Sequence, residues 1–206
     1  EAYGLQDHAP FEETMCPQPI SPYAIGKYAG ELYCRMKQHA HDLPIAVVRP
    51  FNAFGPYQSN KAIIPEIIIK CLKGQTIDTT PGRQTREFNF VGNLAEGIIA
   101  IAENPKTIGK ILNLGSNNDI SIKGLVTFIH EITDSKSRLN IGSLPYRPTE
   151  IWKMAADFSS ARELIGWTPR VSFEDGLRIT VDWYRKYLEI YENSESDLLR
   201  LGQYDY

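Results

Sequence analysis

Tyr23 and Lys27 are the residues whose types and spacing most directly suggest chemistry. A spacing of four places both side chains on one face of a helix, about one turn apart. An ammonium held beside a phenol favours the phenolate form, so Tyr23 could serve as a general base. Because Tyr-xxx-Lys pairs are also common on helix surfaces, the interpretation depends on the neighbouring residues.

The pair falls within a predicted helix that runs from Ser21 to about residue 41. Ser21 is a candidate N-cap, and Pro22 suits the first helical position. Further along, residues 45–51 form a short β-branched run, typical of a strand buried on both faces of a parallel sheet. The turn at residues 52–56 therefore lies at the carboxyl end of a strand, where open α/β sheets bind ligands.

Hydrophobic periodicity and turn residues predict alternating helices and strands in the rest of the chain. The predicted helices are residues 63–72, 93–103, 121–133, 159–165 and 172 to about 192, and the predicted strands are residues 86–91, 110–114 and 138–141. The proline-containing residues 1–22 are predicted to be a surface loop. This alternation indicates an α/β fold with a parallel sheet.

The composition is typical of a folded chain. The 206 residues are 42% hydrophobic, enough for a sizeable core, and a formal charge of -3 gives no basic surface for nucleic acid. No apolar stretch approaches the roughly 18 residues of a membrane span, so we expect a cytoplasmic protein that binds neither nucleic acid nor membrane. Cys16, Cys34 and Cys71 are too unevenly spaced for a disulfide framework or a zinc site, and no metal is expected.

Several segments, in order along the chain, resemble one enzyme family. They are EAYG (1–4), SPYAIGK (21–27), RPFNAFGP (49–56), KAIIPEII (61–68), GRQTREFNFV (82–91), LNLGSNN (112–118), RPTEIWKMAAD (147–157) and ARELIGWTPRVSFEDGLRITVDWY (161–184). Together they are similar to the extended short-chain dehydrogenase/reductase family, in its branch of NAD-dependent nucleotide-sugar epimerases and dehydratases.

The resemblance implies a division of the chain. Residues 1–115 would be the C-terminal part of a Rossmann-type parallel sheet, with interleaved substrate-binding segments at about 53–82. Residues 116–192 would be mainly a small α+β substrate-binding lobe, and residues 193–206 a polar tail. The family's glycine-rich turn for the cofactor pyrophosphate and its catalytic Ser or Thr are absent from the sequence. We therefore expect a fragment that holds about half of an active site.

The resemblance assigns catalytic and cofactor roles. Tyr23 matches the tyrosine that takes the proton of the sugar 4-hydroxyl while hydride leaves carbon 4 for the nicotinamide. Lys27 matches the lysine that supports the phenolate and holds the nicotinamide ribose, and Pro50 is expected beside the cofactor. The implied cofactor is NAD, and NADP stays open because the residue that distinguishes them is not in the sequence.

The resemblance also implies a nucleotide-diphosphate sugar as the ligand. Asn52 matches an Asn that contacts the diphosphate, and Arg86 and Arg147 match arginines that clamp the diphosphate and the nucleotide ribose, a role suited to a guanidinium fork. The plainer alternatives are that an isolated Arg is a solvated surface residue and that an Asn after a strand is a turn former.

Three further ligand contacts and a quaternary structure follow from the same resemblance. Lys61 and Ile63 fall in the segment that closes over the nucleotide, and Asn118 matches a nucleotide-contacting Asn, although LGSNN is equally a plain turn. The family also implies a homodimer formed through the helix that bears Tyr23 and a neighbouring helix that the sequence lacks.

Glu1 bears on the type of reaction. The family's 4,6-dehydratases and decarboxylases carry a Glu before the Tyr-Gly pair, as EAYG does, and a carboxylate there can remove the carbon 5 proton once carbon 4 is oxidised. The 6-hydroxyl then leaves as water, and hydride returns to carbon 6. We therefore expect a 4,6-dehydratase, with a 4-epimerase similar to UDP-glucose 4-epimerase as the alternative. Decarboxylase and 4-ketoreductase rank behind these two, and a non-catalytic fragment is a further alternative for the chain as it stands.

Overall fold

The structure is a computed structural model that describes residues 2–148 and 150–189. The helices in this part of the chain are α1 (Pro22–His41), α2 (Ile63–Leu72), α3 (Val91–Glu103), the short 3₁₀ helix η1 (Pro105–Thr107), α4 (Ile122–Ile132), α5 (Ser159–Ile165) and α6 (Phe173–Lys186). The strands are β1 (Val47–Pro50), β2 (Ala53–Phe54), β3 (Ile77–Thr79), β4 (Thr85–Glu87), β5 (Asn89–Phe90), β6 (Ile111–Leu114), β7 (Asp119–Ser121), β8 (Leu139–Ile141) and β9 (Lys153–Met154).

The helix ends follow the turn and cap residues of the sequence. The Ser21 side chain caps α1 by accepting a hydrogen bond from the backbone N–H of Ala24 at 3.1 Å. Ser121 and Ser172 cap α4 and α6 in the same way. Gly166 ends α5 with a left-handed φ of 67°, a conformation that glycine adopts without strain. The helices predicted at residues 63–72 and 159–165 are confirmed with the same ends as α2 and α5, and the helix predicted from Ser21 to about residue 41 is confirmed as α1.

Most strand pairs are parallel. β1 pairs with β6, β2 with β5, β3 with β8 and β4 with β9, all in parallel, and β4 also pairs antiparallel with β7. Parallel strands need crossover connections, and helices provide several of them here. The predicted α/β class is confirmed.

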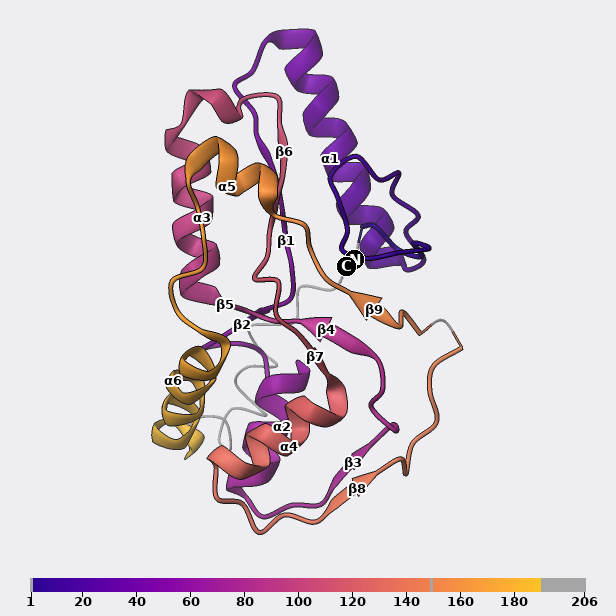
Figure 1. Cartoon of the computed structure of the whole chain (residues 1–206), viewed down its shortest axis with the longest axis vertical. Coiled ribbons are helices and arrows are strands. Elements are labelled where there is room, and N and C mark those ends of the chain that lie inside the picture. The colour runs from indigo at the N-terminus through magenta and orange to yellow at the C-terminus, as the bar shows by residue number, and fades with distance from the viewer. Residues whose placement is uncertain (1, 149, 190–206) are drawn as a thin grey trace.

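β1 and β6 form the middle of three layers (Figure 1). α1 lies on one side of this strand pair, and α3 and α5 lie on the other. The strands share a hydrophobic cluster with α3 and α5 that includes Leu94, Leu114, Phe158 and Trp167. Because helices cover both faces, the strand side chains are mostly apolar, as expected for a parallel sheet.

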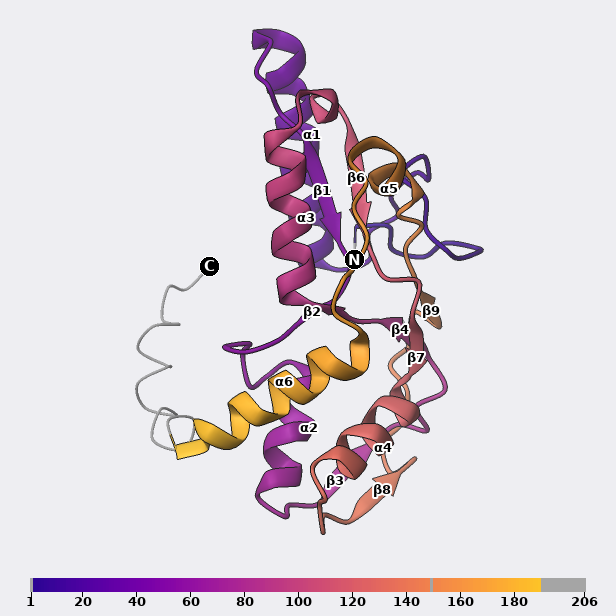
Figure 2. The same cartoon turned by 60° about the vertical axis from the view of Figure 1, so that its left-hand side comes forward.

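A second hydrophobic cluster holds α2, α4 and α6 together. Figure 2 shows these helices gathered at the end of the molecule away from the β1–β6 layer. Ile68, Leu125 and Leu177, one from each helix, are fully buried in the cluster. Burial of each such side chain stabilises the fold by about 1.5 to 3 kcal/mol.

The prediction of a surface loop at residues 1–22 was wrong for part of the segment. Tyr3 and Phe11 are only 3% and 2% exposed, and they pack with Phe51 in a third hydrophobic cluster. The backbone N–H of Phe11 donates to the carbonyl of Ala155 at 2.7 Å. The prolines of the segment suggest a loop, whereas the partners that bury its aromatic residues lie far along the chain.

The single strand predicted at residues 86–91 is two strands, β4 and β5, separated by Phe88. β4 pairs with β7 and β9, but β5 pairs with β2, so the chain changes sheets at Phe88. Phe88 is 6% exposed and joins the second cluster, which explains the change of direction. α6 ends at Lys186, and the predicted end near residue 192 lies outside the described residues.

Residues 2–148 and 150–189 were searched for a membrane-spanning helix and for a cluster of metal ligands. Within them no helix is both long and apolar enough to cross a membrane. In the same residues no group of three or more His, Cys, Asp or Glu side chains is placed to hold a metal ion. Cys16, Cys34 and Cys71 carry free thiols.

Candidate functional site

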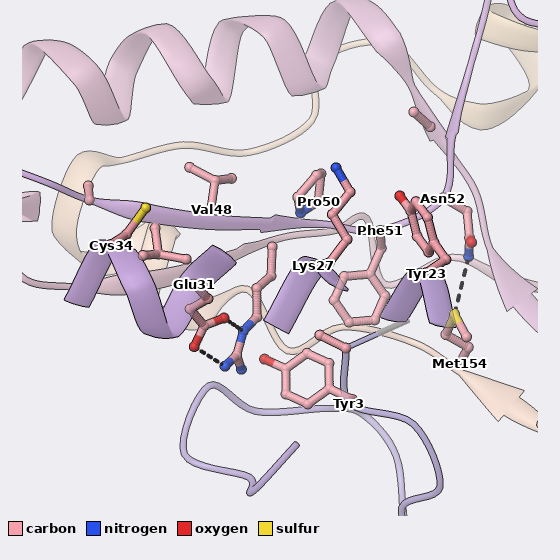
Figure 3. A pocket seen from close by; sticks show the side chains of 15 residues that line it. Tyr3, Tyr23, Lys27, Glu31, Cys34, Val48, Pro50, Phe51, Asn52 and Met154 are labelled. Atoms are coloured by element: carbon pink, nitrogen blue, oxygen red, sulfur yellow. Dashed lines mark hydrogen bonds and ion pairs between the residues drawn. The ribbon is translucent and has the colours of Figure 1, made fainter. Parts of the chain in front are cut away.

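A cavity of about 640 Å³ is lined by residues of α1 and β1 and of the turn after β1. Figure 3 shows its lining side chains, among them Tyr23 and Lys27 from α1, Pro50 from β1 and Asn52 from the turn. Four of the residues predicted from the sequence to bind or act therefore share one cavity. The carboxyl end of a strand and the first turns of a helix bring them together.

Tyr23 and Lys27 lie as their spacing predicts. The Lys27 Nζ is 5.5 Å from the centroid of the Tyr23 ring, and Tyr23 is 62% exposed. A second pair on the same helix, Tyr33 and Lys37, has nearly the same geometry at 5.6 Å, and Tyr33 is 60% exposed. Tyr33 and Lys37 do not line the cavity. The cavity, rather than the spacing, distinguishes the first pair.

Asn52 is held by its own side chain. Its Nδ2 donates to the backbone carbonyl of Glu87 at 2.7 Å and to the Met154 Sδ at 3.6 Å. Its backbone carbonyl accepts from the N–H of Asn89 at 2.9 Å. These bonds attach the turn after β1 to β4, β5 and β9, so the position of Asn52 in the cavity is fixed from outside the turn.

A buried ion pair attaches α1 to β1. Arg49 donates through Nε and Nη2 to the two carboxylate oxygens of Glu31 at 2.9 and 2.7 Å, and both residues are over 90% buried. The guanidinium also lies 4.6 Å from the centroid of the Tyr3 ring. Burial alone would lower the pKa of Arg49, but its bonds to Glu31 and Tyr3 raise that pKa above the usual value. Burial raises the pKa of the Tyr3 phenol.

Arg86 lies on β4, outside the lining of the cavity, and its guanidinium is engaged. Its Nη2 pairs with the Glu150 Oε1 at 2.6 Å, and its Nη1 donates to the carbonyl of Thr85 at 2.8 Å. In the β4–β9 register Arg86 is opposite Met154, which does line the cavity. The predicted clamp is therefore one strand away from the residues around Tyr23.

The remaining predicted ligand contacts are dispersed. Lys61 and Arg147 are exposed, and Ile63 is the half-buried first residue of α2. Asn118 is exposed in the turn after β6 and lines a separate cavity of about 150 Å³. Glu1 lies outside the described residues. The structure does not bring Lys61, Ile63, Asn118 and Arg147 to the cavity that holds Tyr23.

Among the cavity residues that the sequence interpretation missed are Tyr3, Glu31, Arg49 and Met154. Two of them had a usable signal. Arg49 interrupts an otherwise apolar strand, and a charge there requires a partner. Glu31 follows Lys27 by one helical turn on the same face and could have been identified as that partner. Met154 and Tyr3 gave no such signal, because only the folded chain brings them to β1.

The arrangement suits proton transfer from a bound hydroxyl. A phenol and an ammonium lie at one end of the cavity, beside an apolar wall that includes Val48, Pro50 and Phe51. Such a mixture of a few polar groups and an apolar wall is typical of a site for a small molecule or cofactor.

Known proteins match most of the length of the chain. A family model described as GDP-mannose 4,6 dehydratase matches residues 1–180. The dTDP-D-glucose 4,6-dehydratase of Bos taurus is 29% identical over 210 residues, which cover 96% of this chain and 57% of the relative.

Solved structures have the same fold. The epimerase Mth375 of Methanothermobacter thermautotrophicus matches with a TM-score of 0.88 at 29% identity, over 94% of this chain and 59% of that chain. A UDP-glucuronic acid 4-epimerase of Bacillus cereus, in complex with UDP-glucuronic acid and NAD, matches with a TM-score of 0.81 at 28% identity, over 90% of this chain and 59% of that chain. The chain thus spans less than two thirds of these relatives, which include both dehydratases and epimerases.

Proposed function

We propose that this chain, which belongs to the NAD-dependent epimerase/dehydratase family of extended short-chain dehydrogenases, supplies catalytic and binding residues of a nucleotide-sugar 4,6-dehydratase. The observation that carries the proposal is the cavity shared by Tyr23, Lys27 and Asn52. A potential base, a cation and an amide around one cavity suit the oxidation of a sugar hydroxyl. The expected substrate is a nucleotide-diphosphate sugar, as in the Bacillus cereus epimerase.

The residues around the cavity fit the nicotinamide end of NAD. Val48 and Pro50 offer an apolar wall to a flat ring, and Lys27 offers an ammonium to ribose hydroxyls. When bound, NAD supplies a hydride acceptor for carbon 4 and later a hydride donor for carbon 6. We expect Tyr23, Lys27 and Pro50 to hold it. NADP is the alternative, and titration of the protein with each cofactor distinguishes the two.

In the proposed reaction each catalytic residue either transfers one proton or stabilises one charge. Tyr23 takes the proton of the 4-hydroxyl at its phenolate oxygen, and a carbonyl forms at carbon 4 as the hydride departs. Lys27, 5.5 Å from the ring of Tyr23, supports the phenolate. The new carbonyl acidifies carbon 5, and Glu1 is the proposed base for that proton. That proton passes to the 6-hydroxyl, which leaves as water, and the return of the hydride to carbon 6 with a proton to carbon 5 completes the reaction.

The alternative is a nucleotide-sugar 4-epimerase. The similarity of the chain to epimerases is as high as its similarity to dehydratases, which favours keeping this second function. An epimerase returns the hydride to carbon 4 on the other face and needs no base at carbon 5. Glu1 would then have no catalytic role.

Product analysis tests the proposal. The full-length gene product that carries these residues is incubated with NAD and with UDP-, dTDP- and GDP-hexoses, and products are identified by mass spectrometry and NMR. Loss of one water with a carbonyl at carbon 4 is the expected result. An isomer of unchanged mass with inverted carbon 4 would establish the epimerase instead. No conversion of any of these sugars would contradict both and leave a binding function without catalysis.

The Glu1→Gln variant tests directly whether Glu1 is the base at carbon 5. If Glu1 is the base at carbon 5, this variant still reduces NAD in the presence of substrate, which is seen as nicotinamide absorbance, but it releases no dehydrated product. Dehydrated product at the unchanged rate would contradict the assignment of Glu1.

Five further residues are proposed to bind the nucleotide-diphosphate sugar. We propose that Arg86 and Arg147 bind the diphosphate and ribose, and that Lys61, Ile63 and Asn118 contact the nucleotide. We likewise propose a cofactor-binding part at residues 1–115, with substrate segments at about 53–82, and a mainly substrate-binding lobe at residues 116–192. The Arg86–Glu150 pair supports the first assignment only in part, because the guanidinium already has a carboxylate partner in the free protein.

We also propose a homodimer formed through α1. Ile25, Tyr33 and Met36 are 55%, 60% and 46% exposed on this helix, and a helix that exposes several large apolar side chains is a candidate protein interface. Sedimentation velocity should give a dimer for the full-length protein and a monomer for Met36→Glu. A wild-type monomer would contradict the proposal.

A further inference from the structure

The loop between β2 and α2, residues 55–62, contains Lys61, which is proposed to contact the nucleotide, and it is attached to α6. We propose that Trp183 and Tyr184 of α6 are positioning residues that hold this loop, and that they set the affinity for the nucleotide-diphosphate sugar without changing the affinity for NAD. The inference rests on the proposed function, because it uses the proposed contact of Lys61. Neither residue of α6 lines the cavity around Tyr23.

Tyr57 has a backbone conformation that a tyrosine seldom adopts. Its φ is 63°, in the left-handed region, where residues other than glycine are strained. The side chain is 81% exposed, so burial in the core does not compensate for this strain. Its ring lies instead against the ring of Trp183, with the centroids 4.6 Å apart. The contact with α6 therefore offsets the unfavourable conformation of the loop backbone.

A hydrogen bond at the next residue joins the same loop to α6. The Tyr184 side chain is fully buried, and its hydroxyl donates to the backbone carbonyl of Gln58. Trp183 and Tyr184 are adjacent, with ring centroids 4.9 Å apart, so one turn of α6 provides both attachments. Figure 2 shows α6 beside the segment between β2 and α2. The loop is thus held at two successive residues, by a ring contact and by a hydrogen bond.

Local hydrogen bonds extend this fixed position to Lys61. The Ser59 hydroxyl accepts from the backbone N–H of Lys61 at 3.3 Å. The Ser59 carbonyl accepts from the backbone N–H of Ala62 at 3.0 Å. Because Ser59 directly follows Gln58, a displacement of the residues attached to α6 also displaces Lys61.

The side chain of Gln58 attaches the loop to the cavity wall. Its Nε2 donates to the backbone carbonyl of Ala53 at 2.8 Å, and Ala53 lines the cavity around Tyr23 together with Asn52. Asn52 is held separately, because its Nδ2 donates to the carbonyl of Glu87. A loosened loop should therefore change the place of Lys61 and leave the cavity proposed for NAD intact.

A fixed loop favours binding for a thermodynamic reason. Lys61 is exposed, and its ammonium can attract an anionic nucleotide. If the loop is already ordered in the free protein, the ligand does not have to order it on binding. If the loop is loose, only the molecules in the binding arrangement accept the ligand, and the apparent dissociation constant rises in inverse proportion to their fraction.

The first test removes the ring of Tyr57 and keeps its backbone conformation. Asparagine tolerates a left-handed φ, so Tyr57→Asn loses the contact with Trp183 without added strain. Dissociation constants of UDP-glucose, dTDP-glucose and GDP-mannose are measured by calorimetry on the full-length protein with NAD present. We expect about threefold to tenfold weaker binding of the sugar nucleotide that the wild type binds, the range for one aromatic contact, and NAD binding within about twofold.

Three further variants follow from the same contacts. Tyr57→Phe keeps the ring and should bind the sugar nucleotide as the wild type does. Trp183→Leu should reproduce the loss of Tyr57→Asn, and the two changes together should add little to either alone. Tyr184→Phe removes only the hydroxyl that donates to Gln58, and it should also weaken the sugar nucleotide about threefold to tenfold.

Steady-state kinetics separates positioning from a loss of folded protein. A variant that folds less well has fewer active molecules, so its kcat falls and its KM does not change. The loop variants should instead raise KM for the sugar nucleotide and leave kcat within about twofold, because Tyr23 and Lys27 are untouched. A fall in kcat at unchanged KM would overturn the positioning role.

Tyr187→Ala is the matched control. Its ring also lies against Trp183, with the centroids 5.1 Å apart, but Tyr187 belongs to the end of α6 and not to the loop. This variant should leave the affinity for the sugar nucleotide within about twofold of wild type. A loss as large as that of Tyr57→Asn would show that the aromatic cluster acts through α6 in general, and it would overturn the inference.

The remaining outcomes separate this inference from the proposed function. If Tyr57→Asn weakens the sugar nucleotide and NAD equally, or weakens neither, the inference is overturned and the proposed function stands. If the wild-type protein binds none of the three sugar nucleotides, the proposed function fails, and with it the effect on affinity. Hydrogen exchange then decides whether α6 positions the loop. The backbone N–H groups of Lys61 and Ala62 should exchange about threefold to tenfold faster in Tyr57→Asn, and unchanged rates contradict the positioning.

Discussion

Two tyrosine–lysine pairs of equal spacing lie on α1, and they provide their own control. Tyr23 and Tyr33 are equally exposed and equally close to their lysines, but only Tyr23 lines the cavity. We expect Tyr23→Phe to lower kcat about a hundredfold to ten-thousandfold, the range for loss of a general base, and Tyr33→Phe to leave kcat within about twofold. Steady-state kinetics on the full-length protein checks both, and equal losses in the two variants would contradict the assignment.

At the scale of single residues, the sequence predicts which side chains can do chemistry better than it predicts their partners. The four-residue spacing puts Tyr23 and Lys27 on one helix face, and the end of a strand puts Asn52 near them. Nothing local indicates that Met154 borders Asn52 or that Glu150 pairs with Arg86. Those contacts depend on which strands become neighbours, which the sequence pattern leaves open.

At the scale of elements, the Glu31–Arg49 pair sets how α1 lies against β1. Both side chains are over 90% buried and are joined by two hydrogen bonds, so removal of one charge leaves the other buried without its partner. We expect Glu31→Gln to lower the free energy of unfolding by about 3 kcal/mol. Urea denaturation measures this change.

The double variant Glu31→Leu/Arg49→Met is the control for that result. An apolar pair of similar volume leaves no charge unpaired, so it should recover most of the loss. A Glu31→Gln variant within about 0.5 kcal/mol of wild type would show that the pair contributes little to the packing of α1.

A charged residue before α5 gives this element a pH dependence. Hydrogen bonds from the hydroxyl and the backbone N–H of Ser159 lower the pKa of Asp157. A lowered folded pKa contributes stability above the ordinary aspartate pKa of about 4, and this contribution is lost as the pH falls through the folded pKa. We expect Asp157→Ala to be less stable than wild type by about 0.5 to 1 kcal/mol at neutral pH.

The difference in the free energy of unfolding between wild type and Asp157→Ala should then decrease below about pH 4, because the wild-type carboxyl takes up its proton there. Thermal unfolding of both proteins over that range measures it. A stability difference that does not change with pH would mean that the charge of the Asp157 carboxylate does not stabilise the fold.

Helix boundaries follow local chemistry and were predicted well, because Ser21, Ser121 and Gly166 act on their own helix ends. The break between β4 and β5 was missed for the opposite reason. Phe88 turns the chain because distant residues of the second cluster bury it, and a six-residue window shows only weak alternation.

At the scale of the whole molecule, the third hydrophobic cluster joins parts of the chain that are far apart in sequence. Phe11 packs against Tyr3 and Phe51, with ring centroids 5.3 and 6.2 Å away, and it is 2% exposed. We expect Phe11→Ala to lower the free energy of unfolding by about 3 kcal/mol, measured by urea denaturation. The exposed Tyr57→Ala is the comparison, and an equal effect of the two changes would contradict a core role for Phe11.

The attachment of the N-terminal segment also has a consequence for synthesis. Tyr3 bonds to Asn113, and Phe11 bonds to Ala155. Residues 3–11 are therefore synthesised well before the residues that bury them leave the ribosome. Contacts between such distant positions form slowly, and unpaired aromatic side chains attract chaperones or other nascent chains in the meantime. The helix that carries Tyr23 is thus made long before β9, which completes the wall of its pocket, has been translated.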